Sequence, residues 1–280
     1  MDQCAPCYAS PQYPRGSSDI GIVPHSNTKD VDPLSDIVLV TGASRGIGAS
    51  IAEAYARRPD TIVLINYHSD EEGAERTLET VRSLGAQGSC YQADVAEADD
   101  VAEMANRIST DYGRPLTTLV NNVGQIVRPS GWLEISPNDL QRTIAVNLLS
   151  VFWTIRSFAP AMIEAKKGHI VNLCTTYAIN GAAPVLSYTA AKAGVAAITT
   201  AMAAELGQHG IRVNAVAPGN IDTEMTRSAG ADVVQWSIET TPLGRLGATH
   251  EVAEAVEFLE DSAFVTGEII KVDGGQILKI

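Results

Sequence analysis

The sequence is poor in three features, and each absence argues against a class of protein. Lys and Arg number 20 against 33 Asp and Glu, so the surplus of cations that binds nucleic-acid phosphates is missing. Four cysteines in 280 residues are too few and too scattered for a disulfide framework. The longest stretch without Asp, Glu, Lys or Arg, from Gly168 to Ala191, is interrupted by Asn, Gly and Pro, unlike a membrane span. We therefore expect neither nucleic acid nor membrane as a partner.

The first 35 residues also lack a helix or strand period. They hold five of the 13 prolines, which predicts an extended or partly disordered leader over residues 1–35. Cys4 and Cys7 form a Cys-x-x-Cys pair there, as in a redox pair or half a zinc site, but no second pair completes the three or four ligands that a metal needs. No basic start precedes an apolar run as in a secretory signal. We expect an incidental pair, no metal site and a cytoplasmic protein.

From Asp36 onward, short apolar β-branched runs alternate with longer segments of helical period. The predicted strands are 37–41, 61–66, 88–93, 118–121, 169–175, 212–217 and 268–272. The predicted helices are 46–57, 70–84, 96–111, 137–165, 187–209 and 250–260. Near-continuous apolar strands are typical of a parallel sheet covered on both faces. We therefore predict one Rossmann-type, doubly wound, seven-stranded α/β domain over residues 36–280, with its ligand site beyond the carboxyl ends of the strands.

A glycine-rich turn joins the first predicted strand to the first helix. Glycine permits positive φ and a close approach of backbone to ligand, and the helix start behind it offers free N–H groups to a pyrophosphate. Packing glycines at a strand–helix junction would look similar, but the position of this turn favours a dinucleotide site. The predicted cofactor contacts in the turn are Gly42, Ser44, Arg45, Gly46, Ile47 and Gly48.

The end of the second strand bears on which nicotinamide cofactor binds. An Asp or Glu there holds a ribose with free hydroxyls, whereas a 2′-phosphate requires a cation. After Asn66, Tyr67 and Ser69 the first carboxylate is Asp70. Arg45 could supply the cation, helped by donors on Asn66 and Ser69, or could simply face solvent. We expect NADP(H) in preference to NAD(H).

Four motifs occur in order along the chain. They are Thr41-Gly42-x-x-x-Gly46-x-Gly48, Asn121-Asn122-Val123-Gly124, Tyr188-x-x-x-Lys192 and Pro218-Gly219-Asn220-Ile221-x-Thr223. With them the sequence resembles the short-chain dehydrogenase/reductase family, and most of all its 3-oxoacyl-acyl-carrier-protein reductase and carbonyl reductase members. The resemblance runs from about residue 36 to the end of the chain. It implies an NAD(P)-dependent oxidoreductase that interconverts a carbonyl and a secondary alcohol.

Tyr188 and Lys192 lie four residues apart, so they share a face of a helix. A nearby ammonium favours the phenolate and is expected to lower the pKa of the tyrosine from about 10 toward the working range. By resemblance, Tyr188 exchanges a proton with the substrate oxygen and Lys192 also holds the nicotinamide ribose. The family's serine, which hydrogen-bonds that oxygen, corresponds to Thr175, with Thr176 a less favoured stand-in. Threonine keeps the hydroxyl and adds a methyl group.

The resemblance assigns further residues. Asn147 matches an asparagine that holds a water in the proton relay, although by sequence it could instead cap a kink in a long buried helix. Asp94, with Val95, matches the residue that binds the adenine amino group. The other cofactor contacts it implies are Asn122, Val123, Gly124, Pro218, Gly219, Ile221 and Thr223.

Segments 125–132, 178–186 and a predicted lid over about 222–248 are expected to shape the substrate pocket. The lid contains Met225, Val233, Val234, Trp236 and Ile238. These residues predict an apolar pocket for an uncharged ketone or β-keto ester, unless they only pack the lid onto the body. Arg227 and Arg245 are the candidates there for binding an anion.

Three functions stay open on the sequence. The first is NADPH-dependent reduction of a ketone or 3-oxoacyl carbonyl, and the second is NAD-dependent oxidation of a secondary alcohol or polyol. The third is a non-catalytic nucleotide sensor, which would be expected to lack Tyr188 or Lys192. By resemblance, the protein assembles as a homotetramer or homodimer through helices 137–165 and 187–209.

Overall fold

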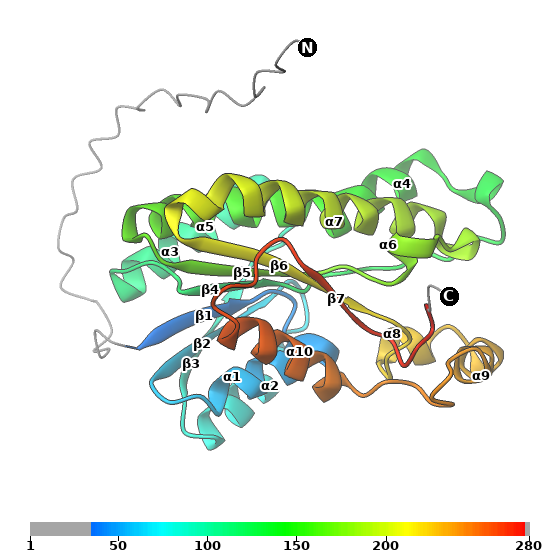
Figure 1. Ribbon diagram of the computed structural model, residues 1–280, viewed down its shortest axis with the longest axis horizontal. Coiled ribbons are helices and arrows are strands. Elements are labelled where there is room, and N and C mark those ends of the chain that lie inside the picture. The colour runs from blue at the N-terminus through cyan, green and yellow to red at the C-terminus, as the bar shows by residue number, and fades with distance from the viewer. Residues whose placement is uncertain (1–34, 278–280) are drawn as a thin grey trace, which may run out of the picture.

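Seven parallel strands form a sheet in the order β3-β2-β1-β4-β5-β6-β7 in the computed structural model, which describes residues 35–277 (Figure 1). Except for Ser35, the predicted leader lies outside the described residues, as does its Cys4–Cys7 pair. The strand order reverses between β1 and β4, so the doubly wound fold predicted from the sequence is confirmed. The strands are β1 (Asp36–Val40), β2 (Thr61–Tyr67), β3 (Gln87–Gln92), β4 (Thr118–Asn121), β5 (Gly168–Leu173), β6 (Ile211–Pro218) and β7 (Ile269–Val272).

Helices cover both faces of the sheet and bury an apolar cluster on each. Alternate residues of a strand face opposite sides: Ile37 and Leu39 of β1 belong to one cluster, and Val38 and Val40 belong to the other. Helices α3, α5 and α7 cover the first cluster, and α1, α2 and α10 cover the second (Figure 1). Their bounds are α1 (Gly46–Ala56), α2 (Glu71–Ser83), α3 (Ala98–Tyr112), α5 (Ser150–Ala165), α7 (Leu186–Leu206) and α10 (Thr249–Asp261). Burial on both faces explains why the inner strands are mostly apolar, whereas the edge strand β3 is mostly polar and only partly buried.

The helix predicted over 137–165 is not a continuous α-helix. A π-helical segment, Ala145–Leu149, separates α4 (Pro137–Ile144) from α5. Such a segment often marks a functional position, and Asn147 lies within it. The stretch from α4 through α5 is long and apolar enough to cross a membrane, but half of its most apolar window is buried inside the protein. Since α5 packs on the sheet, the stretch is a core element of the domain.

Other differences from the predicted boundaries are small. Asp70 is the N-cap of α2 instead of its first residue, and its carboxylate accepts a hydrogen bond from the Gly73 N–H. The fifth strand ends at Leu173, so Thr175 lies in the following loop. The predicted lid segment contains two short helices, α8 (Glu224–Arg227) and α9 (Ala231–Glu239).

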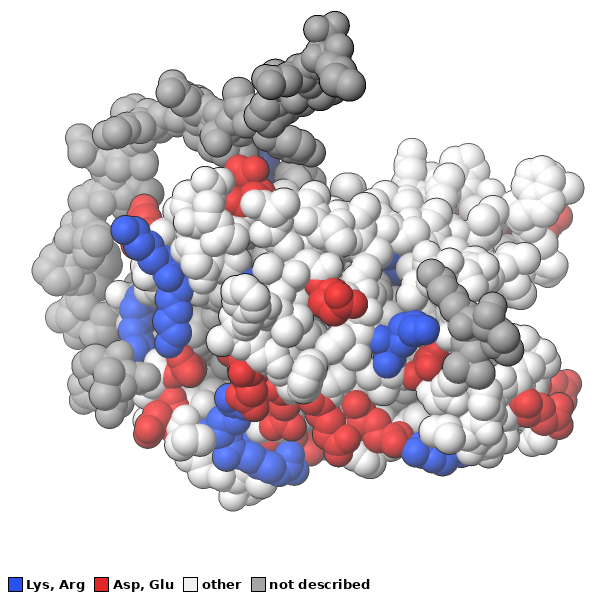
Figure 2. Space-filling view, in the orientation of Figure 1, with Lys and Arg blue, Asp and Glu red and all other residues white. Residues whose placement is uncertain are grey.

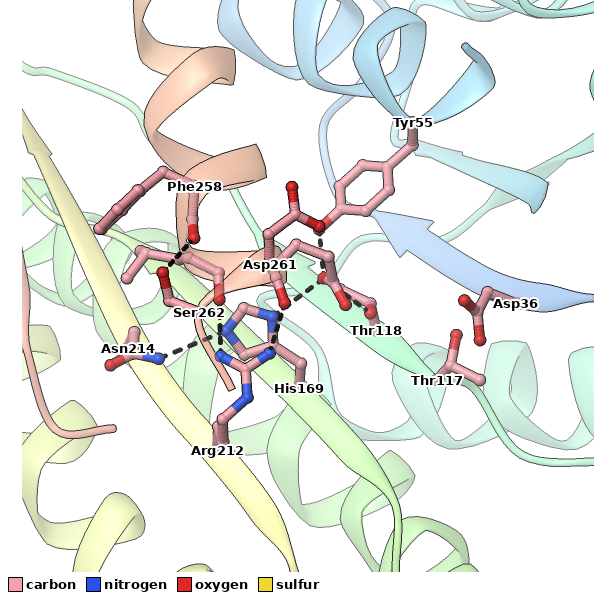
Figure 3. A network of polar contacts seen from close by, with 12 residues as sticks. Asp36, Tyr55, Thr117, Thr118, His169, Arg212, Asn214, Phe258, Asp261 and Ser262 are labelled. Carbon is pink, nitrogen blue, oxygen red and sulfur yellow. Dashed lines mark hydrogen bonds and ion pairs between the residues drawn. The ribbon is translucent and has the colours of Figure 1, made fainter. Parts of the chain in front are cut away.

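A buried polar network closes the amino ends of β4, β5 and β6 (Figure 3). The Glu260 carboxylate accepts hydrogen bonds from Tyr55, Thr118 and His169 at 2.7, 3.1 and 2.9 Å. Burial raises the pKa of Glu260, but these donors outweigh it and bring the pKa to about 2. Burial lowers the pKa of His169, and the hydrogen bond and charge of Glu260 offset part of this effect. Arg212 donates to the last carbonyl groups of α10, where a cation also complements the helix dipole.

Charge on the molecular surface is uneven. On the face drawn in Figure 2, acidic side chains form a band low on the molecule, over α10. The surface above this band, over α7, is mostly uncharged. The excess of acids in the sequence is thus concentrated away from α7 on this face.

Candidate active site

A cleft of about 1620 Å³ opens at the carboxyl ends of the strands. Its walls come from the loops after β1 to β6 and from α8 and α9. In doubly wound sheets this is where ligands bind. Every cofactor and catalytic residue predicted from the sequence lines the cleft except Gly48 and Asn147, which contact residues that do.

The glycine turn is shaped for close approach of a ligand. Gly42 and Gly46 have φ values of +60° and +62°, in the left-handed region that favours glycine. A Cβ on Gly48 would lie 2.5 Å from Asn122 Nδ2 and 2.5 Å from the Gly42 carbonyl oxygen. The N-cap residue of α1, Arg45, makes no side-chain capping bond, so the first N–H groups of α1 are left for a ligand. The turn therefore fits the pyrophosphate of a dinucleotide.

Arg45 lies at the mouth of the cleft between two carboxylates. Its guanidinium contacts Asp70 at 2.8 Å and Glu224 of α8 at 3.1 Å. Burial raises the pKa of Asp70, but hydrogen bonds from the Gly73 N–H and Ser44 and the charge of Arg45 lower it further than burial raises it. Arg45, the cation expected for a 2′-phosphate, therefore lies at the mouth of the cleft, where it joins the glycine turn to the lid segment.

Asn66 lines the cleft but does not offer the free amide donor that we expected. Its Nδ2 lies within hydrogen-bond distance of the carbonyl oxygens of Tyr67, Tyr91 and Ala93, which take up its two hydrogens, and its Oδ1 accepts from the Gly42 N–H at 3.3 Å. The side chain is buried, and it ties β2 to the glycine turn. The hydroxyl of Tyr67 is directed to Glu71 of α2, at 3.4 Å. Ser69 is exposed at the cleft, so its hydroxyl is the predicted donor that remains.

Asp94 lies in the wall of the cleft beside Val95. Its carboxylate accepts hydrogen bonds from Arg142 of α4 at 2.8 Å and from the Ala96 N–H at 3.0 Å. Burial raises the pKa of Asp94, and these two donors lower it below its ordinary value. The side chain is therefore a fixed, ionised acceptor, as binding of an amino group requires. Sequence analysis did not single out Arg142.

Tyr188 and Lys192 lie buried on one face of α7, at the floor of the cleft. Lys192 Nζ donates to the carbonyl oxygens of Leu173 and Val123 at 2.7 and 3.2 Å. Burial lowers the pKa of Lys192 to about 8. Burial also raises the pKa of Tyr188 well above its ordinary value, and a hydrogen bond with Thr175 only partly offsets this. The lowered tyrosine pKa predicted from the Tyr–Lys spacing is therefore wrong here: Tyr188 is a protonated phenol.

Thr175, and not Thr176, has its side chain at the cleft. The Thr175 hydroxyl accepts from the Tyr177 N–H at 3.3 Å and donates to the Pro218 carbonyl oxygen at 3.4 Å. Both contacts are long for hydrogen bonds, so the hydroxyl is free to turn toward a ligand. Thr176 is fully buried and bonds to the same carbonyl. The geometry thus separates two neighbouring threonines that the sequence left as alternatives.

Asn147 connects the π-helical segment to the loop after β4. Its Oδ1 accepts from the Gln125 N–H at 3.0 Å, and its Nδ2 donates to the Gln125 and Thr143 carbonyl oxygens at 2.9 Å each. A Cβ on Gly124 would lie 3.4 Å from Asn147 Oδ1 and 3.7 Å from Lys192 Nζ. Asn147 therefore lies in the π-helical segment and holds the loop at Gly124, which Lys192 also approaches.

The segment after β6 runs from the sheet to the lid past the glycine turn. Gly219 is packed so closely that a Cβ would lie 2.7 Å from Gln276 Oε1. Ile221 forms an isolated bridge with Gly247. Thr223 caps α8 by accepting from the Thr226 N–H. These contacts fix the backbone that the sequence predicts to run along the nicotinamide.

Besides Arg142, sequence analysis did not assign Arg128, Tyr177, Asn220 and Gln276 to the site, although all four line the cleft. Arg128 donates to the Met225 carbonyl oxygen at 3.3 Å and so joins the loop after β4 to α8. Tyr177 donates to Asn220 Oδ1 at 3.0 Å and also bonds to Gln276. The sequence offered only their position as a signal for these residues. Each lies after the end of a strand or in a segment predicted to shape the pocket.

The two lid arginines named from the sequence are not at the cleft. Arg227 pairs with Asp222 at 2.7 Å, and Arg245 pairs with Glu251 at 2.7 Å. Neither side chain is among the residues that line the cleft. The expectation that they could bind an anion of the substrate is therefore wrong.

A glycine turn for a dinucleotide, a buried Tyr–Lys pair and an adjacent hydroxyl, all at the switch point of a doubly wound sheet, define a nicotinamide-dependent oxidoreductase. A family model described as "Enoyl-(Acyl carrier protein) reductase" matches residues 42–276. The chain belongs to the short-chain dehydrogenase/reductase family, and it is an NAD(P)-dependent oxidoreductase.

Known proteins are similar over nearly the whole domain. A 3-oxoacyl-[acyl-carrier-protein] reductase FabG from Staphylococcus epidermidis is 36% identical over 247 residues, which are 88% of this chain and 100% of the relative. A (3R)-3-hydroxyacyl-CoA dehydrogenase from Canis lupus familiaris is 36% identical and aligns over 86% of this chain and 96% of its own. A crystal structure of a 3-oxoacyl-[acyl-carrier protein] reductase from Brucella melitensis has a TM-score of 0.79 at 35% identity, covering 86% of this chain and 90% of that one.

Proposed function

We propose that this protein reduces a ketone or a 3-oxoacyl or β-keto ester carbonyl to a secondary alcohol with NADPH. The observation that carries the proposal is the protonated, buried Tyr188 beside Thr175, in the same cleft as the glycine turn. A protonated phenol is the form that can give a proton to a carbonyl oxygen. Relatives named as 3-oxoacyl-[acyl-carrier-protein] reductases support the same reaction class.

In this mechanism NADPH, when bound, supplies the hydride. Tyr188 gives its phenolic proton to the substrate oxygen, and the Thr175 hydroxyl donates a hydrogen bond to the same atom. Two donors on one developing oxyanion stabilise the charge that builds up there. Because Tyr188, Thr175 and Lys192 are buried, the proton transfer is shielded from water.

Lys192 and Asn147 support the tyrosine. A lysine whose pKa is about 8 carries a positive charge at neutral pH, and this charge stabilises the phenolate left after proton transfer. Lys192 would also hold the nicotinamide ribose. Asn147, which keeps the loop at Gly124 in place, would hold the water that returns the proton. In the reverse direction the same residues take the proton from an alcohol.

The contacts of Asp70 support NADP(H) over NAD(H). Asp70 is the first carboxylate after β2, and it is taken up by Arg45, Ser44 and the Gly73 N–H. It is therefore poorly placed to bind two ribose hydroxyls. Arg45 is 64% exposed at the cleft mouth, where a 2′-phosphate could bind it through paired hydrogen bonds.

We also propose that α8 and α9 act as the substrate lid and that the enzyme is a cytoplasmic homotetramer or homodimer. Leu149, at the end of the π-helical segment, and Phe152 of α5 support assembly through this surface, because each is an apolar side chain more than a third exposed.

The decisive experiment compares initial rates of NADPH and NADH oxidation with ethyl acetoacetate, for the native enzyme and for Tyr188→Phe. We expect faster turnover with NADPH and a loss of at least about 100-fold in kcat for the variant, because the proton donor is gone. Tyr55→Phe is the control and should retain kcat, because it removes a phenolic hydroxyl near the amino ends of the strands, away from the cleft. Faster turnover with NADH would favour the alcohol or polyol dehydrogenase, and no turnover with either cofactor would favour the sensor.

A further inference from the structure

One end of the cleft, next to Tyr188 and under α8, is more polar than an uncharged ketone requires. We call this the polar end and define it by Arg128, Tyr177, Asn220 and Gln276, all of which line the cleft. The reaction proposed above uses none of these four side chains. Their arrangement therefore bears on which substrate the cleft accepts.

Arg128 brings an unneutralised positive charge to the polar end. Three arginines line the cleft, and two of them pair with carboxylates: Arg45 with Asp70, and Arg142 with Asp94. Within residues 35–277, Arg128 pairs with no carboxylate; its one hydrogen bond, to a backbone carbonyl, is 3.3 Å long. A guanidinium has five N–H donors in a planar fork, so most of its capacity is available to a ligand.

The position of this charge relates it to the reacting atoms. Arg128 is close enough to the phenols of Tyr188 and Tyr177 for its charge to favour the ionised form of each. It lies in the loop after β4, whose first residues line the cofactor side of the cleft. An anion held by Arg128 would thus lie in the same cleft as a carbonyl at Tyr188.

The same end holds polar atoms without partners in the part of the chain that the structure describes. Asn220 Nδ2 and Gln276 Oε1 are buried and make no hydrogen bond, although the other contacts of these residues hold the Tyr177 hydroxyl. Unpaired buried polar atoms are costly, so they mark places where a polar ligand is favoured. One donor and one acceptor beside a cation suit a substrate with oxygen functions.

We propose, on the basis of the reductase function above, that the polar end binds an anionic group of the substrate through Arg128. The substrate is then a carbonyl compound with a carboxylate or phosphate a few bonds from the reacting carbon. This differs from the uncharged substrate expected from the sequence. Met225, Val233 and Trp236 on the lid segment would cover the remainder of the molecule.

Arg128 has one other evident role, which is to fasten α8 to the loop after β4 through the Met225 carbonyl. The two roles predict different results. A fastening role affects every substrate alike, whereas an anion-binding role affects charged substrates alone.

The test uses matched substrates that differ in charge. They are 4-oxopentanoate with its methyl ester, for a carboxylate, and dihydroxyacetone phosphate with dihydroxyacetone, for a phosphate. The native enzyme should show at least a tenfold higher kcat/KM for the anion in one of the two pairs, and that pair identifies the group. Arg128→Gln should lower kcat/KM for that anion by about 10- to 100-fold, mainly through KM, since a charge-assisted bidentate contact is lost.

Two further variants complete the design. Arg128→Lys keeps the charge but not the fork and should recover part of the loss. Arg227→Gln removes a lid charge that lies outside the cleft and should leave the preference for the anion unchanged. Equal losses for the neutral and the charged substrate in Arg128→Gln, or no preference for either anion in the native enzyme, would overturn the proposal while the reductase function stood.

Binding distinguishes failure of this proposal from failure of the proposed function. If the native enzyme turns over none of the four compounds, calorimetric titration of each anion into the full chain with NADPH gives the answer. Binding of 4-oxopentanoate or dihydroxyacetone phosphate that Arg128→Gln weakens at least tenfold would support the anion site without the reaction. Binding that the substitution does not change would refute it.

Discussion

Replacing Glu260 by Gln tests whether the network at the amino ends of the strands stabilises the domain. The carboxylate accepts three hydrogen bonds and its side chain is only 20% exposed. Its pKa is about 2 in the folded protein against 4.5 for an ordinary Glu. A difference of about 2.5 units corresponds to about 3 kcal/mol in the free energy of unfolding at pH 7.

The sign of the pH dependence follows from the lowered pKa. Because the folded protein binds the proton of Glu260 more weakly than the unfolded chain does, the stabilisation is fully present above about pH 5 and is lost as the pH falls toward 2. Glu260→Gln should therefore be about 3 kcal/mol less stable than the native protein at pH 7. The gap should shrink by about 1 kcal/mol at pH 3.5.

Urea unfolding followed by tryptophan fluorescence at the two pH values measures this gap. Asp261→Asn is the matched control: it changes the adjacent carboxylate, which is exposed and pairs with Arg58 at the surface, so its cost should stay below about 1 kcal/mol. Turnover should be unaffected in both variants, because the network lies at the amino ends of the strands and the cleft lies at their carboxyl ends. A gap under 1 kcal/mol at pH 7, or one that does not change with pH, would refute the reasoning.

Two further substitutions test the cleft. Thr175→Ala should lower kcat by about 100-fold, as loss of one donor to a developing oxyanion does, whereas Thr175→Ser should retain activity and accept bulkier ketones. Steady-state rates with a series of β-keto esters measure both effects. An active alanine variant would contradict the role of Thr175 as a hydrogen-bond donor to the substrate oxygen. Gly48→Ala places a Cβ 2.5 Å from Asn122 Nδ2 and from the Gly42 carbonyl oxygen. The affinity for NADPH, measured by fluorescence titration, should therefore fall at least tenfold. An unchanged affinity would mean that the glycine turn adjusts to the added methyl group.

The parts of the site that the sequence could predict are those that local sequence determines. The turn at Gly42 and Gly46 needs positive φ, and glycine alone meets that need cheaply. The spacing of Tyr188 and Lys192 places them on one face of a helix wherever that helix packs. Short apolar runs that alternate with segments of helical period likewise predict the fold class before any tertiary contact is known.

Features that depend on tertiary contacts were out of reach. Asn66 was interpreted as a cofactor donor because it ends a strand, but its amide is used by carbonyl groups of segments that are distant in sequence. The pKa of Tyr188 was expected to fall because Lys192 is near, yet burial, which spacing does not reveal, has the larger effect. Arg128 lines the cleft, whereas Arg227 and Arg245 lie outside it and pair with carboxylates, and only the fold reveals this difference.

Charged and polar side chains are paired differently at the amino and the carboxyl ends of the strands. At the amino ends of the strands, the Glu260 carboxylate meets three donors, from Tyr55, Thr118 and His169, so its polar groups are satisfied within the protein. At the carboxyl ends of the strands, Arg128 has no carboxylate partner among the described residues, and Asn220 and Gln276 each have one polar side-chain atom without a hydrogen bond. Incomplete pairing costs stability unless a ligand completes it, so it is tolerated where a ligand binds. This difference, more than the fold itself, indicates that the substrate supplies the missing charge.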